Sequence, residues 1–320
     1  MDNSSLVSIA AIERARQKIA GIALRTPLVR FNRFGLPAEI YLKLENLQPI
    51  GSFKIRGAAN AIAHLSPAQL KRGVLTASAG NMAQGVAWLA RERGIPCTVV
   101  APETAPETKL HAIARLGGNV IKVSFERWWQ TFQERAYPGV NATFIHAFDD
   151  PHVMAGNGLI GLEILEDLPD VDAVVIPWGG GGLACGIASA VRAKKPSCKL
   201  YAAEVATAAP LAASLAAGTV QVVEYQPSFV DGIGSKTVLP QMLDRARELI
   251  EGALVASLAE VAAAVRLLAE RNRIIAEGAG ASPVACALSG RAGAGKIACG
   301  VSGGNIDAMK LRTILGGDSA

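Results

Sequence analysis

Short runs of β-branched and apolar residues alternate with helical patterns along most of this 320-residue chain. Two-residue and 3.6-residue periodicity predicts strands at 40–44, 73–77, 97–101, 120–123, 173–177, 199–204 and 297–301. It predicts helices at 6–20, 55–65, 82–93, 106–116, 159–168, 183–192 and 259–272. Parallel strands need crossover connections, usually helical, so this alternation predicts an α/β fold of largely parallel sheets flanked by helices.

Composition and charge exclude some classes of function for this chain. Half of the residues are apolar but only 5% are aromatic, and the net charge is +5. The basic residues are scattered and no basic run is interleaved with aromatics, so we expect no nucleic-acid partner. Charge, glycine or proline interrupts every long apolar run, and MDNSSLVS lacks the pattern of a secretory signal. Five separated cysteines without a C-x-x-C pair favour free thiols. We expect a cytoplasmic protein without a membrane partner.

A lysine between two apolar residues is the first candidate functional group. Lys54 lies between Phe53 and Ile55, shortly after a turn at Pro49 and Gly51. This setting indicates a buried side-chain stem, and burial lowers the pKa of an amine, which makes it a nucleophile toward an aldehyde. The alternative is a side chain that runs along apolar surface to reach water.

Two turns between a predicted strand and a predicted helix favour anions. Ser78, Ala79, Gly80 and Asn81 follow the strand at 73–77, and the helix at 82–93 comes next, so backbone N–H groups there suit a carboxylate. Here Ser78 is also read as a helix cap.

The second turn is a run of four glycines. Without Cβ atoms, these residues let the backbone approach a phosphate closely, and the following helix adds N–H groups. The pattern matches neither a dinucleotide fingerprint nor a Walker motif, so it predicts a monophosphate site. The residues are Gly179, Gly180, Gly181 and Gly182.

Three further segments complete the organisation. Residues 274–281 bring Glu277 into a glycine-rich bend, and the strand at 297–301 delivers Ser302 to a carboxyl end, where α/β sheets place ligand contacts. The polar segment 146–158 is interpreted as a turn-rich crossing between domains. Aromatic residues gather within 127–143, for which helix packing is the preferred interpretation.

Five motifs in this order resemble one family: SFKIRGA, SAGNMAQG, GGGG, EGAGA and SGGN. They resemble the fold-type-II pyridoxal-phosphate enzymes, whose fold is like that of tryptophan synthase β, and specifically the serine/threonine dehydratase (threonine ammonia-lyase) family. The resemblance runs from the first helix to Asn305. It implies pyridoxal 5'-phosphate as cofactor, an amino acid as substrate, and a homodimer or homotetramer.

The resemblance also implies residue roles. Lys54 would bond to the aldehyde carbon of the cofactor and later remove the α-proton of the substrate, and Phe53 would pack near the cofactor ring. Asn81 would hydrogen-bond the phenolic oxygen and Ser302 would face the pyridine nitrogen. The four glycines would hold the phosphate, and Glu277 would belong to the cofactor site. The turn at Ser78, Ala79, Gly80, Asn81 and Met82 would bind the carboxylate of the substrate.

Departures from the family pattern bear on activity. Ala79 stands where racemases of the group carry a serine, and alanine has no exchangeable proton, so we expect no principal racemase activity. Met82 replaces a histidine of many dehydratases and leaves the side-chain preference open. Glu204 and the carbonyl of Ala208 fit the family's divalent-cation loop, but Pro210 replaces an expected aspartate, which leaves a monovalent ion as an alternative.

The prediction is a two-domain enzyme with the cofactor in the cleft. Residues 1–71 and 151–320 would form the large cofactor-binding domain, and 72–150 a smaller one that closes over the substrate. The reaction would convert a β-hydroxy amino acid, L-threonine or L-serine by default, to a 2-oxo acid and ammonia. The alternatives are a bulkier substrate such as hydroxyaspartate or phenylserine, a β-replacement reaction, or a non-enzymatic binding protein.

Overall fold

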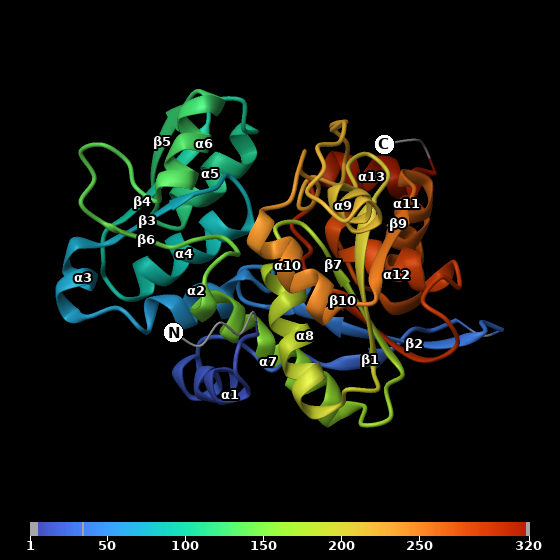
Figure 1. Cartoon of the computed structure of the whole chain (residues 1–320). Helices are drawn as coiled ribbons and strands as arrows, with labels where there is room; N and C mark the ends of the chain where they lie inside the picture. The colour runs from blue at the N-terminus through green and yellow to red at the C-terminus, as the bar shows by residue number, and fades with distance from the viewer. Residues whose placement is uncertain (1–5, 34, 318–320) are drawn as a thin grey trace.

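Two separate sheets organise the chain, which we describe from a computed structural model at residues 6–33 and 35–317 (Figure 1). The larger sheet has the strand order β1-β2-β10-β7-β8-β9. β1 pairs antiparallel with β2, and the other neighbours are parallel. Its strands are β1 (Leu28–Arg30), β2 (Ala38–Leu44), β7 (Ala173–Pro177), β8 (Lys199–Val205), β9 (Gly252–Ala256) and β10 (Gly295–Val301). The α/β fold with largely parallel sheets is confirmed.

The smaller sheet is entirely parallel and has the order β5-β4-β3-β6. Its strands are β3 (Val74–Ala77), β4 (Cys97–Pro102), β5 (Asn119–Val123) and β6 (Thr143–Phe144). The helices α3 (Pro67–Arg72), α4 (Asn81–Glu92), α5 (Glu107–Arg115) and α6 (Phe125–Glu134) belong to the same part of the chain (Figure 1). All four strands thus lie within the proposed small domain, 72–150.

Helices cover both faces of the larger sheet. One apolar cluster joins α1, α2, α7, α8 and α10 to the sheet and continues into α4, and a second joins α11, α12 and α13 to the other face. The bounds are α1 (Ile9–Lys18), α2 (Lys54–Ile62), α7 (Pro151–Asp167), α8 (Gly182–Lys194), α9 (Pro210–Ala217), α10 (Pro240–Leu249), α11 (Leu258–Leu267), α12 (Gly278–Leu288) and α13 (Ala308–Gly316). A 3-10 turn spans Glu45–Leu47, and a π-helical turn spans Leu268–Asn272.

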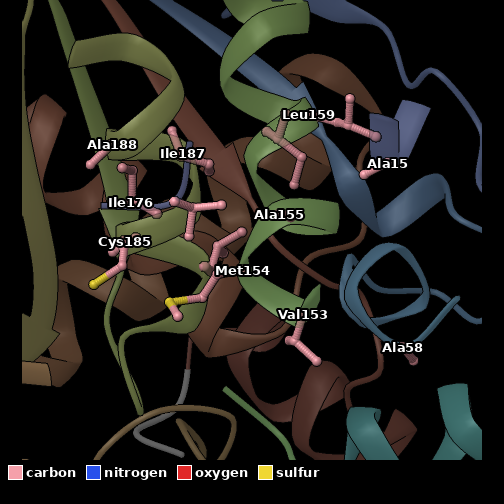
Figure 2. Packing of buried hydrophobic residues seen from close by; sticks show 14 of the residues in the cluster. Ala15, Ala58, Val153, Met154, Ala155, Leu159, Ile176, Cys185, Ile187 and Ala188 are labelled. Atoms are coloured by element: carbon pink, nitrogen blue, oxygen red, sulfur yellow. The ribbon is translucent and has the colours of Figure 1, made fainter. Parts of the chain in front are cut away.

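Helix α7 corrects the sequence interpretation of 146–158. The helix already begins at Pro151, and the Asp150 carboxylate accepts hydrogen bonds from the N–H groups of His152 and Val153. Its glycines are contact points, since a Cβ on Gly156 would lie 2.4 Å from the carbonyl oxygen of Arg56. Figure 2 shows Met154, Ala155 and Leu159 of α7 with Cys185 and Ile187 of α8.

A buried ionic cluster fixes the start of α2. Arg56 donates to Glu45 from Nε at 2.8 Å and to Glu163 from Nη1 at 2.7 Å, and Lys43 lies 2.6 Å from Glu163. The Lys43 and Arg56 side chains are at most 1% exposed. The Thr26 hydroxyl also donates to Glu45. Each buried charge thus has partners on other elements.

The aromatic residues near 127–143 confirm the helix-packing interpretation for α6. Trp128 and Trp129 stack with Phe132 at centroid distances of 5.9 and 5.5 Å, and Phe132 contacts His146 and Phe148. Tyr137 lies beyond the end of the helix, with the Arg127 guanidinium over its ring. In the part of the chain that the structure describes, no helix is both long and apolar enough to span a bilayer.

Candidate active site

Three neighbouring strands of the larger sheet deliver sequence-predicted residues at their carboxyl ends. β2, β10 and β7 lie side by side and parallel. The loop after β2 leads to Lys54, Ser302 follows β10, and the glycine run follows β7. The N–H of Phe53 donates to the carbonyl of Ser302 at 3.0 Å, so the lysine loop and the end of β10 are joined directly. This edge is where α/β sheets place ligands.

The Lys54 amine is partly buried and directed at the backbone. Its Nζ donates to the carbonyl oxygen of Ala147 at 2.7 Å and lies 5.1 Å from the centroid of the Phe53 ring. Burial lowers the pKa of Lys54 to about 8, and the charge of Glu277 opposes part of this shift. The amine therefore loses its proton at a lower pH than an exposed lysine does.

Three of the four glycines, Gly180, Gly181 and Gly182, are closely packed by neighbouring residues. A Cβ on Gly180 would lie 2.2 Å from Cδ1 of Phe148, and one on Gly182 would lie 2.6 Å from the Phe148 carbonyl oxygen. Gly181 has a φ of +91° and is the residue before α8, which begins at Gly182. Larger residues are excluded here, and the N–H groups at the start of α8 remain available to an anion.

The turn after β3 supplies the opposite side of the site. The Ser78 hydroxyl accepts from the N–H of Gly80 at 3.2 Å, and α4 begins at Asn81 with Gly80 at the capping position. The reading of Ser78 as a helix cap is therefore wrong, because its hydroxyl bonds within the turn. Ser78, Ala79 and Gly80 are partly exposed.

Asn81 links this turn to the larger sheet. Its Nδ2 donates to Glu277 Oε1 at 2.8 Å, and its Oδ1 accepts from Asn305 Nδ2 at 2.8 Å. Asn305 also donates to the carbonyl of Ile50, just before the lysine loop. Gly51 has a φ of +70°, which favours glycine, and a Cβ there would lie 2.4 Å from Asn305 Oδ1. Elements of both sheets therefore converge on Asn81.

Glu277 is the residue before α12, which corrects its placement in a bend. Burial raises the pKa of Glu277 to about 7, and the charge of Asp231 raises it further, while the hydrogen bond from Asn81 and the charges of Lys109 and Lys54 lower it. The carboxyl group therefore titrates near neutrality beside Asn81.

Three further sequence candidates are buried: Met82 lies in the core, and Glu204 and Ala208 lie at or just after the carboxyl end of β8, the strand next to β7. Met82 is 2% exposed and packs in the apolar cluster. Glu204 accepts hydrogen bonds from the N–H groups of Leu211 at 3.0 Å and Ala212 at 2.8 Å, at the start of α9. Ala208, which lies between Glu204 and α9 in the sequence, is also buried. Among residues 6–33 and 35–317, no group of three or more His, Cys, Asp or Glu side chains is placed to hold a metal.

Sequence reasoning interpreted the segment after β6 as a crossing between domains and missed its contacts with the site. Ala147 supplies the carbonyl that faces Lys54, Phe148 packs on the glycine run, and His146 accepts two backbone N–H groups in between. Asn305 was seen only as part of a motif. A lone histidine and an alanine carbonyl carry no pattern in a sequence, although the aromatic concentration in α6 pointed to this region.

Comparison with known proteins places the chain in one family. The family model described as pyridoxal-phosphate dependent enzyme matches residues 19–303. The chain belongs to this family of pyridoxal-phosphate dependent enzymes. It is 40% identical to an L-threonine ammonia-lyase of Thermotoga maritima over 319 residues, covering 97% of this chain and 78% of that protein.

Two further comparisons agree. The chain is 36% identical to an L-threonine dehydratase, catabolic TdcB, of Staphylococcus aureus over 324 residues, covering 98% of this chain and 94% of the relative. The solved structure of maize serine racemase superposes with a TM-score of 0.87 at 32% identity and covers 96% of each chain. Both the dehydratase and the racemase branches are thus among its relatives.

Proposed function

We propose that this protein is a pyridoxal-phosphate dependent ammonia-lyase that converts a β-hydroxy amino acid, L-threonine first, to a 2-oxo acid and ammonia. The observation that carries the proposal is the Lys54 amine, partly buried, with its pKa lowered to about 8, at the sheet edge that also bears the glycine run and Ser302. The relatives named as threonine ammonia-lyase and dehydratase support the substrate class.

The residues present fit the cofactor. The cradle at Gly180 and Gly182 has no room for a Cβ and would hold the phosphate with the first N–H groups of α8. Asn81 would bind the phenolic oxygen, with Glu277 as its neighbour. Ser302, which is 3% exposed, would donate to the ring nitrogen through a neutral hydroxyl, and Phe53 would pack near the ring.

The protein groups would share the chemistry as follows. When bound, pyridoxal 5'-phosphate withdraws electrons from the α-carbon of an amino acid and so favours loss of the α-proton and of the β-hydroxyl. Lys54 Nζ would accept the α-proton. The N–H groups of the Ser78–Asn81 turn would orient the substrate carboxylate. Racemisation needs a group that returns a proton to the α-carbon from the side opposite Lys54. The Ala79 side chain has no exchangeable proton, which favours elimination over racemisation.

Three secondary assignments belong to this proposal. We propose 72–150 as a small domain that closes over the substrate, because its sheet is separate from the other.

Met82 would influence the choice of substrate only through its packing in the core. Glu204 and the Ala208 carbonyl would give a monovalent or divalent cation only a weak site, because the Glu204 carboxylate already accepts two N–H groups. A homodimer or homotetramer in the cytoplasm stays a prediction.

The test is release of 2-oxo acid from a substrate panel by the cofactor-loaded protein. The panel is L-threonine, L-serine, hydroxyaspartate and L-threo-phenylserine, and a separate assay measures the cysteine formed from O-acetylserine with sulfide. The proposal predicts release from L-threonine or L-serine and none from the Lys54→Ala variant. Formation of cysteine without release of 2-oxo acid from the hydroxy amino acids would instead establish β-replacement. No activity and no cofactor uptake would leave a binding protein.

A further inference from the structure

His146 lies just beyond the carboxyl end of β6 in the smaller sheet, next in sequence to the residues that contact Lys54 and the glycine run. β6 ends at Phe144, and the chain then turns through His146, Ala147 and Phe148 toward α7. The His146 side chain is 3% exposed and is enclosed by aromatic rings. Its centroid lies 4.5 Å from that of Phe132 and 4.8 Å from that of Phe148. The histidine is therefore part of the core of the turn.

The hydrogen bonds of this ring define its protonation. Nδ1 of His146 lies 3.2 Å from the backbone nitrogen of Phe148 and 2.8 Å from that of Asp149. Backbone N–H groups only donate, so Nδ1 carries no proton and accepts both bonds. Burial lowers the pKa of His146 to about 4. The positive charges of Arg135 and, more weakly, Lys54 also lower this pKa, whereas the charge of Asp149 raises it. The accepting form therefore persists at neutral pH.

The turn is also held from outside. The Asp149 carboxylate accepts from Arg135 at 2.9 Å, from Arg245 at 3.0 Å and from Gln241 at 3.0 Å. The short segment 147–149 is thus held on one side by the His146 ring and, through Asp149, on the other side by α10. Within this span the Ala147 carbonyl meets Lys54 Nζ, and Phe148 fills the space beside Gly180.

We propose that His146 is a positioning residue for the reaction. Its ring accepts hydrogen bonds from the N–H groups of Phe148 and Asp149. These bonds orient the Ala147 carbonyl toward Lys54, and they hold the Phe148 side chain against the glycine run. The inference rests on the proposed function, since it takes Lys54 as the reacting amine. Within residues 6–33 and 35–317, no hydrogen bond joins the His146 ring to the Lys54 amine or to the glycines. Its influence passes through the backbone of 147–149.

Two substitutions separate the acceptor from the bulk of the ring. His146→Asn keeps an oxygen near the position of Nδ1, whereas His146→Leu keeps apolar volume and removes the acceptor. His111→Leu is the matched control, because the His111 side chain is 76% exposed on α5. We expect His146→Leu to lower kcat for L-threonine by roughly tenfold or more with KM changed by less than about threefold. His146→Asn should restore kcat to within about threefold of the wild type.

A second measurement uses the full chain without cofactor. Amide hydrogen exchange at Phe148 and Asp149 should be faster in His146→Leu than in the wild type, and chemical labelling of Lys54 should be faster at a fixed pH. Both should return toward wild-type rates in His146→Asn. Should His146→Leu not fold, His146→Gln, whose acceptor lies one bond further out, takes its place in both measurements.

Equal kcat losses in the leucine and asparagine variants, or exchange and labelling rates unchanged by loss of the acceptor, would overturn the proposal. A wild-type protein without lyase activity contradicts the proposed function instead. In that case the exchange and labelling measurements still decide whether His146 orients the turn.

Discussion

Individual residues at the site are restricted by what surrounds them more than by their own chemistry. Lys54 has the reactive group, but its depressed pKa comes from burial and its direction from the Ala147 carbonyl. Glycine is required at 180 and 182 because Phe148 occupies the space that a side chain would need. The chemistry of each group therefore depends on neighbours that are distant in sequence.

A pair of glycine substitutions tests this steric account. A Cβ on Gly180 would meet the Phe148 ring at 2.2 Å, whereas the nearest atoms to a Cβ on Gly179 are at 3.6 Å. In the cofactor-free protein, Gly180→Ala should lower the free energy of unfolding by about 1–3 kcal/mol and Gly179→Ala by less than 1 kcal/mol. Denaturant titration measures both. Equal losses would show that the Phe148 contact does not restrict the loop.

Glu204 gives a prediction for pH dependence. Burial raises its pKa to about 7 in the folded protein, against 4.5 ordinarily, so the folded state holds this proton more tightly than the unfolded state. The contribution of this proton to the free energy of unfolding is fully present below about pH 4.5 and is lost as pH rises through about 7. Over this window, the unfolding free energy of Glu204→Gln should rise relative to the wild type by up to roughly 3 kcal/mol. A constant difference between the two proteins would contradict this.

At the scale of elements, the strand ends bring the site together. β2, β10 and β7 are adjacent, so three segments separated by more than a hundred residues in sequence meet at one edge. α2 starts at Lys54 and is fixed two residues later by Arg56 in the buried ionic cluster. The position of the amine therefore depends on that cluster.

Removing Arg56 should destabilise the protein strongly. In Arg56→Met, the carboxylates of Glu45 and Glu163 lose their shared cation while still buried, which costs about 3–5 kcal/mol. Arg16→Met is the control, because Arg16 pairs with Glu166 where both side chains are over 40% exposed, and such pairs contribute about 1 kcal/mol or less. Thermal and denaturant unfolding compare the two. Similar losses would mean that the cluster does not anchor α2.

The sequence predicted the elements that have a clear period and missed those that depend on tertiary contacts. Strand β7 was predicted with its observed bounds because its residues are continuously apolar. Strands β1 and β6 span 3 and 2 residues, too few for a periodic signal. The start of α7 was read as a turn because of Gly156 and Gly158, yet these glycines serve close contacts with Arg56 and Ile12. Motif residues were identified at once, whereas His146 and Ala147 matter only through folded geometry.

At the scale of the whole molecule, a few polar contacts join the two sheets across the site. Lys109 of α5 lies 2.9 Å from Asp231, in the segment between α9 and α10, and Lys310 of α13 approaches the same carboxylate at 3.6 Å. Asn81 makes another connection, to Glu277 and Asn305. Closure of the proposed small domain would therefore be favoured by contacts near the substrate.

Breaking the Lys109 pair should favour the open arrangement. In Lys109→Gln, loss of a partly exposed pair worth up to about 1 kcal/mol would shift an open–closed equilibrium by up to roughly fivefold. Lys122→Gln is the control, since Lys122 pairs with Glu107 within the same part of the chain. KM for L-threonine should rise in the first variant and stay constant in the second. Identical KM values would argue against closure through this contact.

Covalent trapping shows which lysine holds the cofactor. The protein is loaded with pyridoxal 5'-phosphate, reduced with borohydride, digested, and analysed by mass spectrometry. We expect the pyridoxyl-phosphate mass on the peptide that contains Lys54, and we expect it to be absent from Lys54→Ala. Modification of another lysine in the wild type, or of none, would show that Lys54 does not hold the cofactor.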